Sequence, residues 1–299
     1  MKPLIMPLPG NRDSADRLAV RLDAELGTIT ARRFPDGESY LRVESPVEGR
    51  DVILFCTLDR PDEKVLPLLF SAAAAKDLGA ARVGLVAPYL AYMRQDRRFQ
   101  PGEAVSSVYF ARLLSGFVDW VVTVDPHLHR RRALGEIYSI PTGAVQAAPL
   151  ISEWIHANIK SPVLVGPDAE SEQWVSEVAK GAGAPSIVLE KIRGGDREVE
   201  VSGPDMSRWR KHTPVLVDDI ISTARTMIEA AGHLRRAGLP PPVCIGIHAV
   251  FADQAYDDLR KAGVAGVVTC NTVPHLSNAI DLTDLLAERV REMKEPMPL

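Results

Sequence analysis

The chain has 299 residues, which is enough for two domains of ordinary size, and its 46% hydrophobic and 25% charged content is that of an average globular protein. The formal net charge of -4 at pH 7 disfavours a surface that binds nucleic acid, because such surfaces need clustered positive charge. Three cysteines, Cys56, Cys244 and Cys270, lie in apolar runs and are expected to be free thiols in a reducing, cytoplasmic compartment. The N-terminal residues lack the pattern of a signal peptide, and no run approaches the roughly 20 apolar residues of a membrane helix, so no membrane partner is expected.

Short apolar runs alternate with segments of helical periodicity along the whole chain, which is typical of an α/β protein. Strands are predicted at residues 51–58, 82–88, 120–125, 162–167, 186–190, 214–218, 243–250 and 266–270. Helices are predicted near residues 14–26, 63–78, 104–115, 146–159, 170–182, 223–237, 252–262 and 281–294. This order predicts two similar doubly wound domains with mostly parallel sheets, residues 1–145 and 146–299, and leaves open whether the last helix packs back on the first domain.

The first candidate site is the sequence FPDGE, Phe34 to Glu38, whose Asp-Gly pair marks a tight turn. The weak alternation at residues 39–43 predicts a strand that would complete a hairpin. The aromatic ring of Phe34 and the carboxylates of Asp36 and Glu38 would suit an adenine base, which stacks and donates hydrogen bonds. A plain surface hairpin explains the pattern equally well.

Residues 88–103 follow a predicted strand and interleave arginines with aromatic side chains. Arginine binds phosphate through paired hydrogen bonds, and a neighbouring glutamine can contact the edge of an adenine. Composition alone favours a solvated charged loop for such a run. The position after a strand of the sheet favours a nucleotide contact by Arg94 and Gln95.

The next predicted strand ends in TVDPHLHRRR, residues 123–132. His127 and His129 are two residues apart, and on an extended strand both side chains would point to one face. Two histidines without a third suitably spaced ligand are weak support for zinc, so metal coordination by both is disfavoured. A structural role is expected for His129.

In the second half, the apolar residues 215–217 predict a buried strand that ends at Asp218 and Asp219. Residues 222–223 are expected to cap a helix over residues 224–236. A hydroxyl-rich turn at a helix N-terminus offers N–H groups and the positive end of the helix dipole to a phosphate. Carboxylates beside it would suit ribose hydroxyls, Mg2+, or both; a βα unit with an acidic loop is the plainer alternative.

Two further segments follow strands of the second half. Asp168, in the sequence GPDAE, either caps a helix or takes part in a second acidic site. Lys191 and Arg193 end the strand predicted at 186–190, and two glycines follow. The polar, aperiodic segment up to Lys211 is typical of a mobile lid, although an ordinary solvated loop has the same pattern.

Together these motifs resemble those of the ribose-phosphate pyrophosphokinase (PRPP synthetase) family. The matching motifs are F-P-D-G-E, R-Q-D-R-R-F-x-P-G-E, D-P-H, G-P-D, E-K-I-R and V-D-D-I-I-S-T-x-x-T, in the order of that family, and N-T-V-P-H-x-S-N extends the match to Asn278. The sequence is closer to the archaeal-type branch. The activation by phosphate and inhibition by ADP that are typical of the bacterial and human enzymes are therefore not expected to carry over.

The resemblance implies two phosphoribosyltransferase-type domains, with an ATP site in residues 1–145 and a ribose 5-phosphate site in residues 146–299. It implies transfer of the β,γ-diphosphoryl group of ATP to the anomeric hydroxyl of ribose 5-phosphate, which gives PRPP and AMP, with Mg2+ as the cofactor. It also implies a homo-oligomer, at least a dimer, in which the F-x-D-G-E turn completes the nucleotide site of a neighbouring subunit.

The resemblance also assigns roles to single residues. The implied catalytic residues are Lys191, Arg193 and His127, and the implied metal ligands are His127 and Asp168. ATP contacts are implied for Phe34, Asp36, Glu38, Arg94, Gln95 and Asp96. Contacts to ribose 5-phosphate are implied for Asp218, Asp219, Ser222, Thr223, Ala224, Arg225 and Thr226. Family members often have glycine where this chain has Ala224, so the backbone there is expected to avoid positive φ.

Two other functions remain open at this point. A phosphoribosyltransferase that consumes PRPP has one such domain and lacks the R-Q-D and F-x-D-G-E elements. A non-catalytic regulatory subunit associated with PRPP synthetase would be expected to have a disrupted Lys191–Arg193 segment or long insertions, and the sequence has neither.

Overall fold

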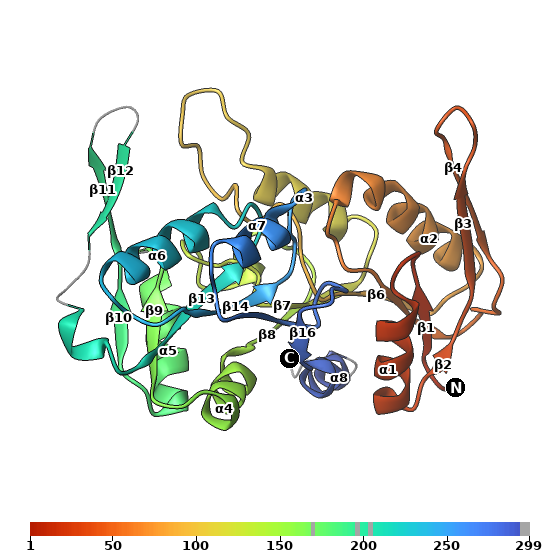
Figure 1. Cartoon of the computed structure of the whole chain (residues 1–299). Helices are drawn as coiled ribbons and strands as arrows, with labels where there is room; N and C mark the ends of the chain where they lie inside the picture. Colours follow the sequence, from red (N-terminus) through yellow and green to blue (C-terminus); the bar gives the residue numbers. More distant parts are fainter. Residues whose placement is uncertain (169–170, 195–197, 203–205, 294–299) are drawn as a thin grey trace. The chain divides into compact units, whose positions relative to one another are not determined.

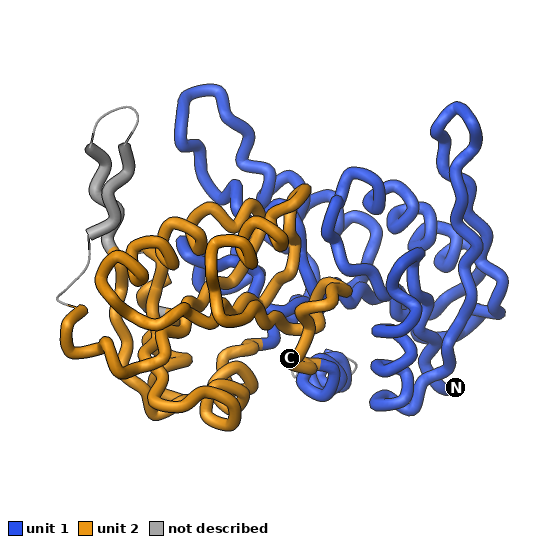
Figure 2. The backbone as a smooth tube through the Cα atoms, viewed as in Figure 1, with its two compact units in different colours: residues 1–145, 283–299 blue, residues 146–282 orange. Residues whose placement is uncertain are grey.

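The computed structural model describes residues 1–168, 171–194, 198–202 and 206–293, and it describes side chains in these ranges except at residues 173 and 190–202. The chain divides into two compact units, which Figure 2 colours separately. Unit 1 comprises residues 1–145 and 283–299, and unit 2 comprises residues 146–282. In the described part of the chain, no helix is both long and apolar enough to cross a membrane.

Unit 1 is built on a six-stranded parallel sheet with the order β2-β1-β5-β6-β7-β8. Its strands are β1 (Leu4–Pro7), β2 (Glu25–Leu26), β5 (Asp51–Phe55), β6 (Arg82–Ala87), β7 (Trp120–Val124) and β8 (Thr142–Val145). Its helices are α1 (Arg12–Leu22), α2 (Val65–Asp77), α3 (Ser106–Ser115) and α8 (Thr283–Glu292), with short 3-10 turns η1 (Pro61–Glu63) and η2 (Leu134–Glu136). β3 (Ile29–Arg33) and β4 (Ser39–Val43) form a separate antiparallel hairpin.

Helices cover both faces of this sheet, which explains its continuous apolar strands. All residues of β1 and β7 are buried. The consecutive right-handed crossovers through α2 and α3 place these two helices on one face, and Figure 1 shows α1 and α8 on the other. α8 packs against α1, β7 and β8, and Arg21 of α1 pairs with Asp284 of α8.

Unit 2 has a six-stranded parallel sheet with the order β10-β9-β13-β14-β15-β16. Its strands are β9 (Pro162–Gly166), β10 (Ser186–Val188), β13 (Thr213–Ile220), β14 (Val243–His248), β15 (Gly266–Cys270) and β16 (Asn278–Ile280). Its helices are α4 (Ala148–Asn158), α5 (Glu172–Ala182), α6 (Arg225–Arg236) and α7 (Ala255–Lys261), with the 3-10 turn η4 (Ser207–Trp209). β11 (Glu190–Gly194) and β12 (Glu198–Ser202) pair as an antiparallel hairpin.

The two units are structural repeats of each other. When the strands of each main sheet are numbered along the chain, both sheets have the spatial order 2-1-3-4-5-6, and both units carry a hairpin between their second and third strands. The units also exchange a helix. α4 follows the last strand of unit 1 but packs against α5, whereas α8 follows the last strand of unit 2 but packs against α1.

The α/β class and the doubly wound, parallel architecture predicted from the sequence are confirmed. The structure adds strands that the sequence did not predict, among them β1, β2, β8 and β16, which are four residues long or shorter. The segment predicted as an aperiodic lid differs most, because its described part contains the β11–β12 hairpin and η4.

Candidate functional site

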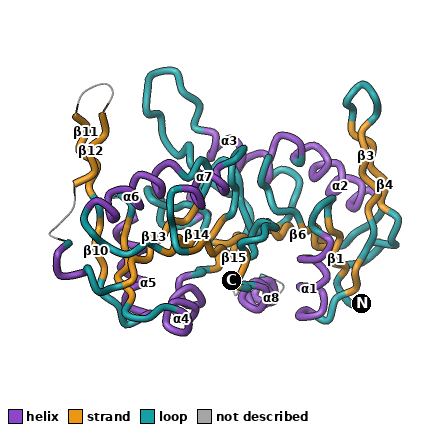
Figure 3. Tube along the Cα trace, in the orientation of Figure 1, coloured by secondary structure: helices purple, strands orange, loops and turns teal. Residues whose placement is uncertain are grey.

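In a parallel sheet the loops after the strands reach one edge, and the candidate residues of each unit lie in such loops or in its hairpin. Unit 1 carries its candidates in the β3–β4 hairpin, the β6–α3 loop and the loop after β7. Figure 3 shows the β6–α3 loop as a long projecting segment before α3. Unit 2 carries its candidates after β9 and β13 and in β11.

The FPDGE turn closes the β3–β4 hairpin as the sequence predicts. Phe34 N–H donates to the carbonyl of Glu38 (2.8 Å), and Gly37 takes a φ of 94°, which glycine adopts without strain. The Asp36 carboxylate accepts the N–H of Glu38 at 3.1 Å. Part of the hydrogen-bonding capacity of Asp36 therefore shapes the turn itself.

A stacked cation fixes the aromatic ring of this turn. The guanidinium carbon of Arg32 lies 4.7 Å from the ring centroid of Phe34 and 4.4 Å from that of Tyr40. Phe34 as a residue is still 38% exposed. The hairpin thus presents an oriented aromatic surface, as a base-stacking site requires.

Glu103 organises the β6–α3 loop. Its carboxylate accepts the backbone N–H groups of Phe99 (2.7 Å) and Gln100 (3.0 Å), and its carbonyl accepts from Arg98 Nε (3.0 Å). The guanidinium of Arg97 lies 4.8 Å from the ring centroid of Phe99. These contacts give a charged loop a defined shape.

The carboxylate of Asp96 is buried against an arginine side chain. Its side chain is only 3% exposed, and Arg130 Nη1 lies 3.2 Å from each carboxylate oxygen. Arg131 Nη2 donates to the carbonyl of Asp96 at 3.3 Å. Two consecutive arginines of the loop after β7 therefore hold both the side chain and the backbone of Asp96.

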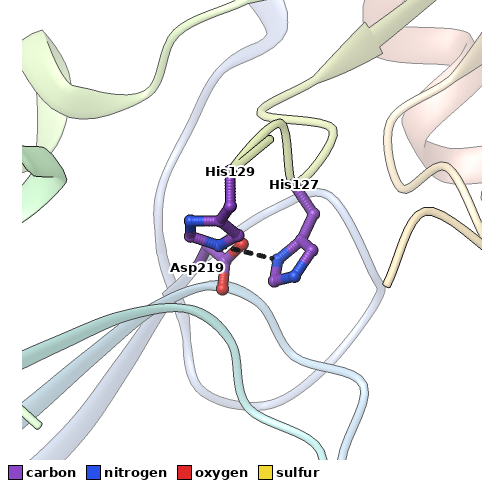
Figure 4. A group of neighbouring side chains, drawn as sticks. All are labelled: His127, His129 and Asp219. Atoms are coloured by element: carbon purple, nitrogen blue, oxygen red, sulfur yellow. Dashed lines mark hydrogen bonds between the residues drawn. The ribbon is translucent and has the colours of Figure 1, made fainter. Parts of the chain in front are cut away.

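The D-P-H motif is a strained turn and not the extended strand that the spacing argument assumed. Asp125 and His127 have φ values of 32° and 51°, and the N–H of His127 donates to the carbonyl of Asp125 at 2.8 Å. Positive φ at a residue other than glycine costs about 1–3 kcal/mol and is concentrated at functional sites. The side chains of His127 and His129 still meet: Nδ1 of His127 and Nε2 of His129 are 3.1 Å apart (Figure 4).

In unit 2, Asp218 and Asp219 belong to β13, which extends to Ile220 and not only to residue 218 as predicted. Burial, and then the negative charges of Asp219 and Asp168, raise the pKa of Asp218 well above its usual value. One oxygen of Asp218 accepts the N–H of Asp219 at 3.0 Å. The edge of this sheet thus concentrates carboxylates that repel one another.

The turn after β13 leads to α6, which begins at Arg225. Ala224 adopts a φ of 56°, so the expectation that its backbone avoids positive φ is wrong. The turn requires a left-handed residue, and alanine adopts that conformation at a cost of about 1–2 kcal/mol. The N-cap residue Ala224 has no side-chain cap hydrogen bond, so the predicted hydroxyl cap is also wrong.

The other candidates of unit 2 are less fully described. Asp168 does not cap α5, whose N-cap is Ser171; the Ser171 hydroxyl donates to the carbonyl of Asp168 at 2.6 Å. Lys191 and Arg193 lie in β11, but their side chains are outside the described residues. Gly195 is likewise outside them.

The carboxylates of unit 2 fit a hard divalent cation better than the imidazole of His127 does. Mg2+ prefers oxygen ligands, and the raised pKa of Asp218 records negative charge that such a cation would relieve. Asp168 is one source of that charge. Nδ1 of His127 is already paired with His129.

The sequence did not single out Glu103 or Arg130. Glu103 was quoted only as the end of a motif, and Arg130 lay in a run of three arginines without distinguishing features. An available signal was that Asp96 lies among the arginines of its loop and that three further arginines, residues 130–132, follow the neighbouring strand β7.

The structure defines a pair of α/β units of the phosphoribosyltransferase type, and comparisons with known proteins agree. A model of the N-terminal domain of ribose phosphate pyrophosphokinase matches residues 4–117, and a phosphoribosyl transferase domain model matches residues 133–284. Ribose-phosphate pyrophosphokinases of Methanothermobacter thermautotrophicus and Methanopyrus kandleri are each 34% identical to the chain, over 97% and 93% of its length and 100% and 94% of theirs. The crystal structure of phosphoribosylpyrophosphate synthetase from Mycobacterium smegmatis superimposes with a TM-score of 0.87 at 25% identity, covering 98% of this chain and 99% of that one. The chain belongs to the ribose-phosphate pyrophosphokinase family.

Replacing Asp218 by Asn is expected to stabilise the ligand-free protein near pH 7. The pKa of Asp218 is higher in the folded chain than the value of about 3.9 in an unfolded one, so its ionisation lowers the stability progressively as the pH rises above about 3.9, and the full loss is present above the folded pKa. Asn keeps the acceptor for the N–H of Asp219 and removes the charge. Thermal unfolding should show a rise of about 4 °C for each kcal/mol of relief, and the gain should vanish as the pH falls toward about 4.

Asp253→Asn, at an exposed carboxylate of the same unit, is the control for this prediction. An Asp218→Asn variant that melts no higher than wild type at pH 7 would contradict the inference that the ionised Asp218 is destabilised by burial and by the neighbouring carboxylates.

Replacing Arg130 by Ala is expected to loosen the β6–α3 loop, because Asp96 loses its ion pair. Amide hydrogen exchange over residues 95–100 should accelerate by about tenfold, which corresponds to about 1.4 kcal/mol. Arg132→Ala is the matched control, because Arg132 is a neighbouring exposed arginine. Equal exchange in the two variants would show that the Asp96–Arg130 pair does not order the loop.

Proposed function

We propose that the chain transfers the β,γ-diphosphoryl group of ATP to the anomeric hydroxyl of ribose 5-phosphate, giving PRPP and AMP. The observation that carries this proposal is the presence, in one chain, of two phosphoribosyltransferase-type units with different chemistry in their loops. Unit 1 offers an oriented aromatic ring and arginines, and unit 2 offers a carboxylate cluster beside the N-terminus of α6. Relatives 34% identical over nearly the whole chain carry the corresponding name.

Unit 1 is the proposed ATP site. The exposed ring of Phe34 would stack on adenine, and Glu38, with the free capacity of Asp36, would accept its amino group. Arg94 and Gln95 lie in the β6–α3 loop, whose shape is held by Asp96 and Glu103. We therefore assign to Asp96 the role of orienting this loop, since its carboxylate is buried on Arg130.

Unit 2 is the proposed ribose 5-phosphate site. The first N–H groups of α6 and the positive end of its dipole would bind the 5′-phosphate, together with the hydroxyls of Ser222, Thr223 and Thr226. Asp218 and Asp219 would accept the ribose hydroxyls. Arg225 is exposed at the start of α6. Its position is compatible with a contact to the 5′-phosphate and with a side chain that extends into solvent.

The reaction forms a bond between the anomeric oxygen and the β-phosphorus and breaks the bond from that phosphorus to the oxygen of the α-phosphate. The anomeric hydroxyl loses its proton, and AMP leaves with the bonding electron pair. Negative charge develops on the leaving oxygen and is spread over the β-phosphoryl oxygens, so cations held in place lower the barrier. The cations proposed for this role are Lys191 and Arg193 of β11, with His127 near the β,γ-phosphates.

Mg2+ is the proposed cofactor, held by Asp168 with the neighbouring carboxylates of unit 2, and it would neutralise phosphate charge when bound. His127 is the second predicted ligand. Its ring nitrogen is a softer donor than Mg2+ prefers, so the carboxylates are the better-supported part of this set. The cytoplasmic location likewise remains a prediction.

We propose that the chain forms a homodimer or larger homo-oligomer through the face formed by α2 and α3. Four large apolar side chains are exposed there in two i, i+4 pairs: Leu66 (54%) with Phe70 (41%), and Tyr109 (48%) with Leu113 (42%). Such clusters on one face mark protein interfaces. Because β4 packs against α2, a neighbour on this face would lie close to the FPDGE hairpin.

The alternatives have less support. A transferase that consumes PRPP would not need the N-terminal domain that the family model matches at residues 4–117. A regulatory subunit with long insertions is disfavoured because the alignment with the Methanothermobacter relative covers 97% of this chain and 100% of that one.

The direct test is to incubate the purified protein with Mg-ATP and ribose 5-phosphate and to quantify AMP and PRPP together. Equal amounts of the two products are expected, with activity lost in EDTA and restored by Mg2+. Formation of ADP, or no AMP at high protein concentration, would contradict the proposal.

Lys191→Ala is expected to lower kcat by about 10²–10³-fold, the usual loss when one preorganised donor to a transition state is removed. The affinity for ATP, measured by calorimetry, should stay within a few-fold of wild type. Lys211→Ala, which removes an exposed lysine that follows η4, is the control. A raised KM with an unchanged kcat would instead make Lys191 a contact of the ground state.

Phe70→Glu is expected to dissociate the oligomer, because it places a charge in the centre of the apolar face. Sedimentation should show a smaller species, and the KM for ATP should rise more than that for ribose 5-phosphate. Val20→Glu is the matched control, since Val20 is also apolar and exposed (69%) but lies on α1. A wild-type protein that is a fully active monomer at assay concentration would refute the shared site.

A further inference from the structure

The repeat of the two units extends to a tripeptide. Pro126-His127-Leu128 follows β7, the fifth main strand of unit 1, and Pro274-His275-Leu276 follows β15, the fifth main strand of unit 2. In both copies the histidine Nδ1 pairs with the residue two positions on. His127 meets His129 at 3.1 Å, and His275 meets the hydroxyl of Ser277 at 2.7 Å. His275 thus lies in the same tripeptide, after the equivalent strand, as His127, yet it has no role in the reaction described above.

A directed chain of hydrogen bonds fixes the His275 ring. The N–H of Ser277 donates to Nδ1 of His275 (3.2 Å), so Nδ1 is an acceptor. The Ser277 hydroxyl lies 2.8 Å from that of Thr269, and Asn278 Nδ2 donates to the Thr269 hydroxyl (2.9 Å). One direction satisfies all of these groups: Asn278 to Thr269, Thr269 to Ser277, and Ser277 to His275. Burial lowers the pKa of His275, which favours the neutral ring that this acceptor role of Nδ1 requires.

The fixed ring packs into an aromatic cluster. Its centroid lies 4.7 Å from that of Phe251 and 4.7 Å from that of Tyr256, and the Phe251 and Tyr256 rings are 5.3 Å apart. Phe251 follows β14, and Tyr256 lies in the first turn of α7. The cluster therefore joins the loop after β15 to the loop after β14.

The loop after β14 is in turn bonded to the backbone of the turn that follows β13. Phe251 N–H donates to the carbonyl of Ile221 (2.9 Å), and Ala252 N–H donates to the carbonyl of Ser222 (3.1 Å). These two carbonyls belong to the start of residues 221–226, which we call the phosphate turn. A continuous path of ring contacts and hydrogen bonds thus runs from His275 through Phe251 to the phosphate turn.

We propose that His275 is a positioning residue that holds the phosphate turn in its binding geometry through Phe251. The proposal rests on the proposed function for the identity of the ligand, ribose 5-phosphate, and on the contacts above for the mechanism. The turn needs such support because Ala224 holds an unfavourable left-handed conformation within it (φ 56°) and has no side-chain cap hydrogen bond. Because the His275 ring packs against Phe251, it limits the backbone conformations that this strained turn can adopt.

The test compares His275→Ala with Leu276→Ala in the full-length protein. Leu276 is the adjacent residue, is 75% exposed, and lies outside the path. Calorimetry of ribose 5-phosphate binding should show a dissociation constant about tenfold higher for His275→Ala, which corresponds to about 1.4 kcal/mol, and little change for Leu276→Ala. The affinity for ATP should be unchanged in both variants, and in the coupled assay KM for ribose 5-phosphate should rise with kcat retained.

A double-mutant cycle tests the path itself. If His275 acts through Phe251, then Phe251→Ala should also weaken ribose 5-phosphate binding, and the double variant should bind no more weakly than the worse single variant. His275→Phe, which keeps a ring against Phe251, should recover part of the affinity. Additive losses, or no recovery with Phe, would overturn the proposal.

Hydrogen exchange of the free protein separates this proposal from the assignment of the ligand. Amides of residues 221–226 should exchange faster in His275→Ala than in wild type or in Leu276→Ala. If the wild-type protein fails to bind ribose 5-phosphate, the proposed function is wrong, and the exchange rates still decide whether His275 holds the turn. Identical exchange in the His275→Ala and Leu276→Ala variants would refute the positioning role.

Discussion

All six strands of each main sheet run parallel, and this constraint determines where chemistry can occur in the chain. A parallel sheet sends every loop after a strand to the same edge, so residues far apart in sequence become neighbours within a unit. Asp96 and Arg130 meet for this reason, as do Phe251 and His275. The crossovers that make the strands parallel also require helices on both faces, which leaves the edge as the accessible place for polar groups.

The same architecture is used twice with opposite electrostatics. The loops of unit 1 bring arginines and aromatic rings together, and the carboxylates among them serve as internal acceptors, as Asp96 and Glu103 do. The edge of unit 2 gathers carboxylates close enough to raise the pKa of Asp218. The hairpins are counterparts as well: the FPDGE hairpin of unit 1 occupies the topological position that β11–β12 occupies in unit 2. The repeated scaffold thus presents arginines and aromatic rings at one edge and carboxylates at the other, and the proposed division into an ATP site and a ribose 5-phosphate site rests on this difference.

Sequence reasoning predicted the fold class and every long helix, because those features depend on apolar periodicity that local sequence contains. It missed strands such as β1, since a four-residue run that follows one proline and ends in another has no period to detect. It also failed at Ala224, where the turn forces a conformation that the side chain disfavours. The partner of Asp96 was not predictable, because a buried ion pair between two loops is set by the tertiary fold and not by spacing. Local pattern identified the loops, whereas the tertiary structure determined which of their residues face inward.

The most direct test of this account is amide hydrogen exchange of the whole protein, measured separately with ribose 5-phosphate and with a non-hydrolysable ATP analogue, each with Mg2+. The account predicts that ribose 5-phosphate protects residues 218–226 of unit 2, while the analogue protects residues 34–38 and 94–99 of unit 1. Protection of the unit 1 segments by ribose 5-phosphate alone, or of residues 218–226 by the analogue alone, would contradict the division of substrates between the two units.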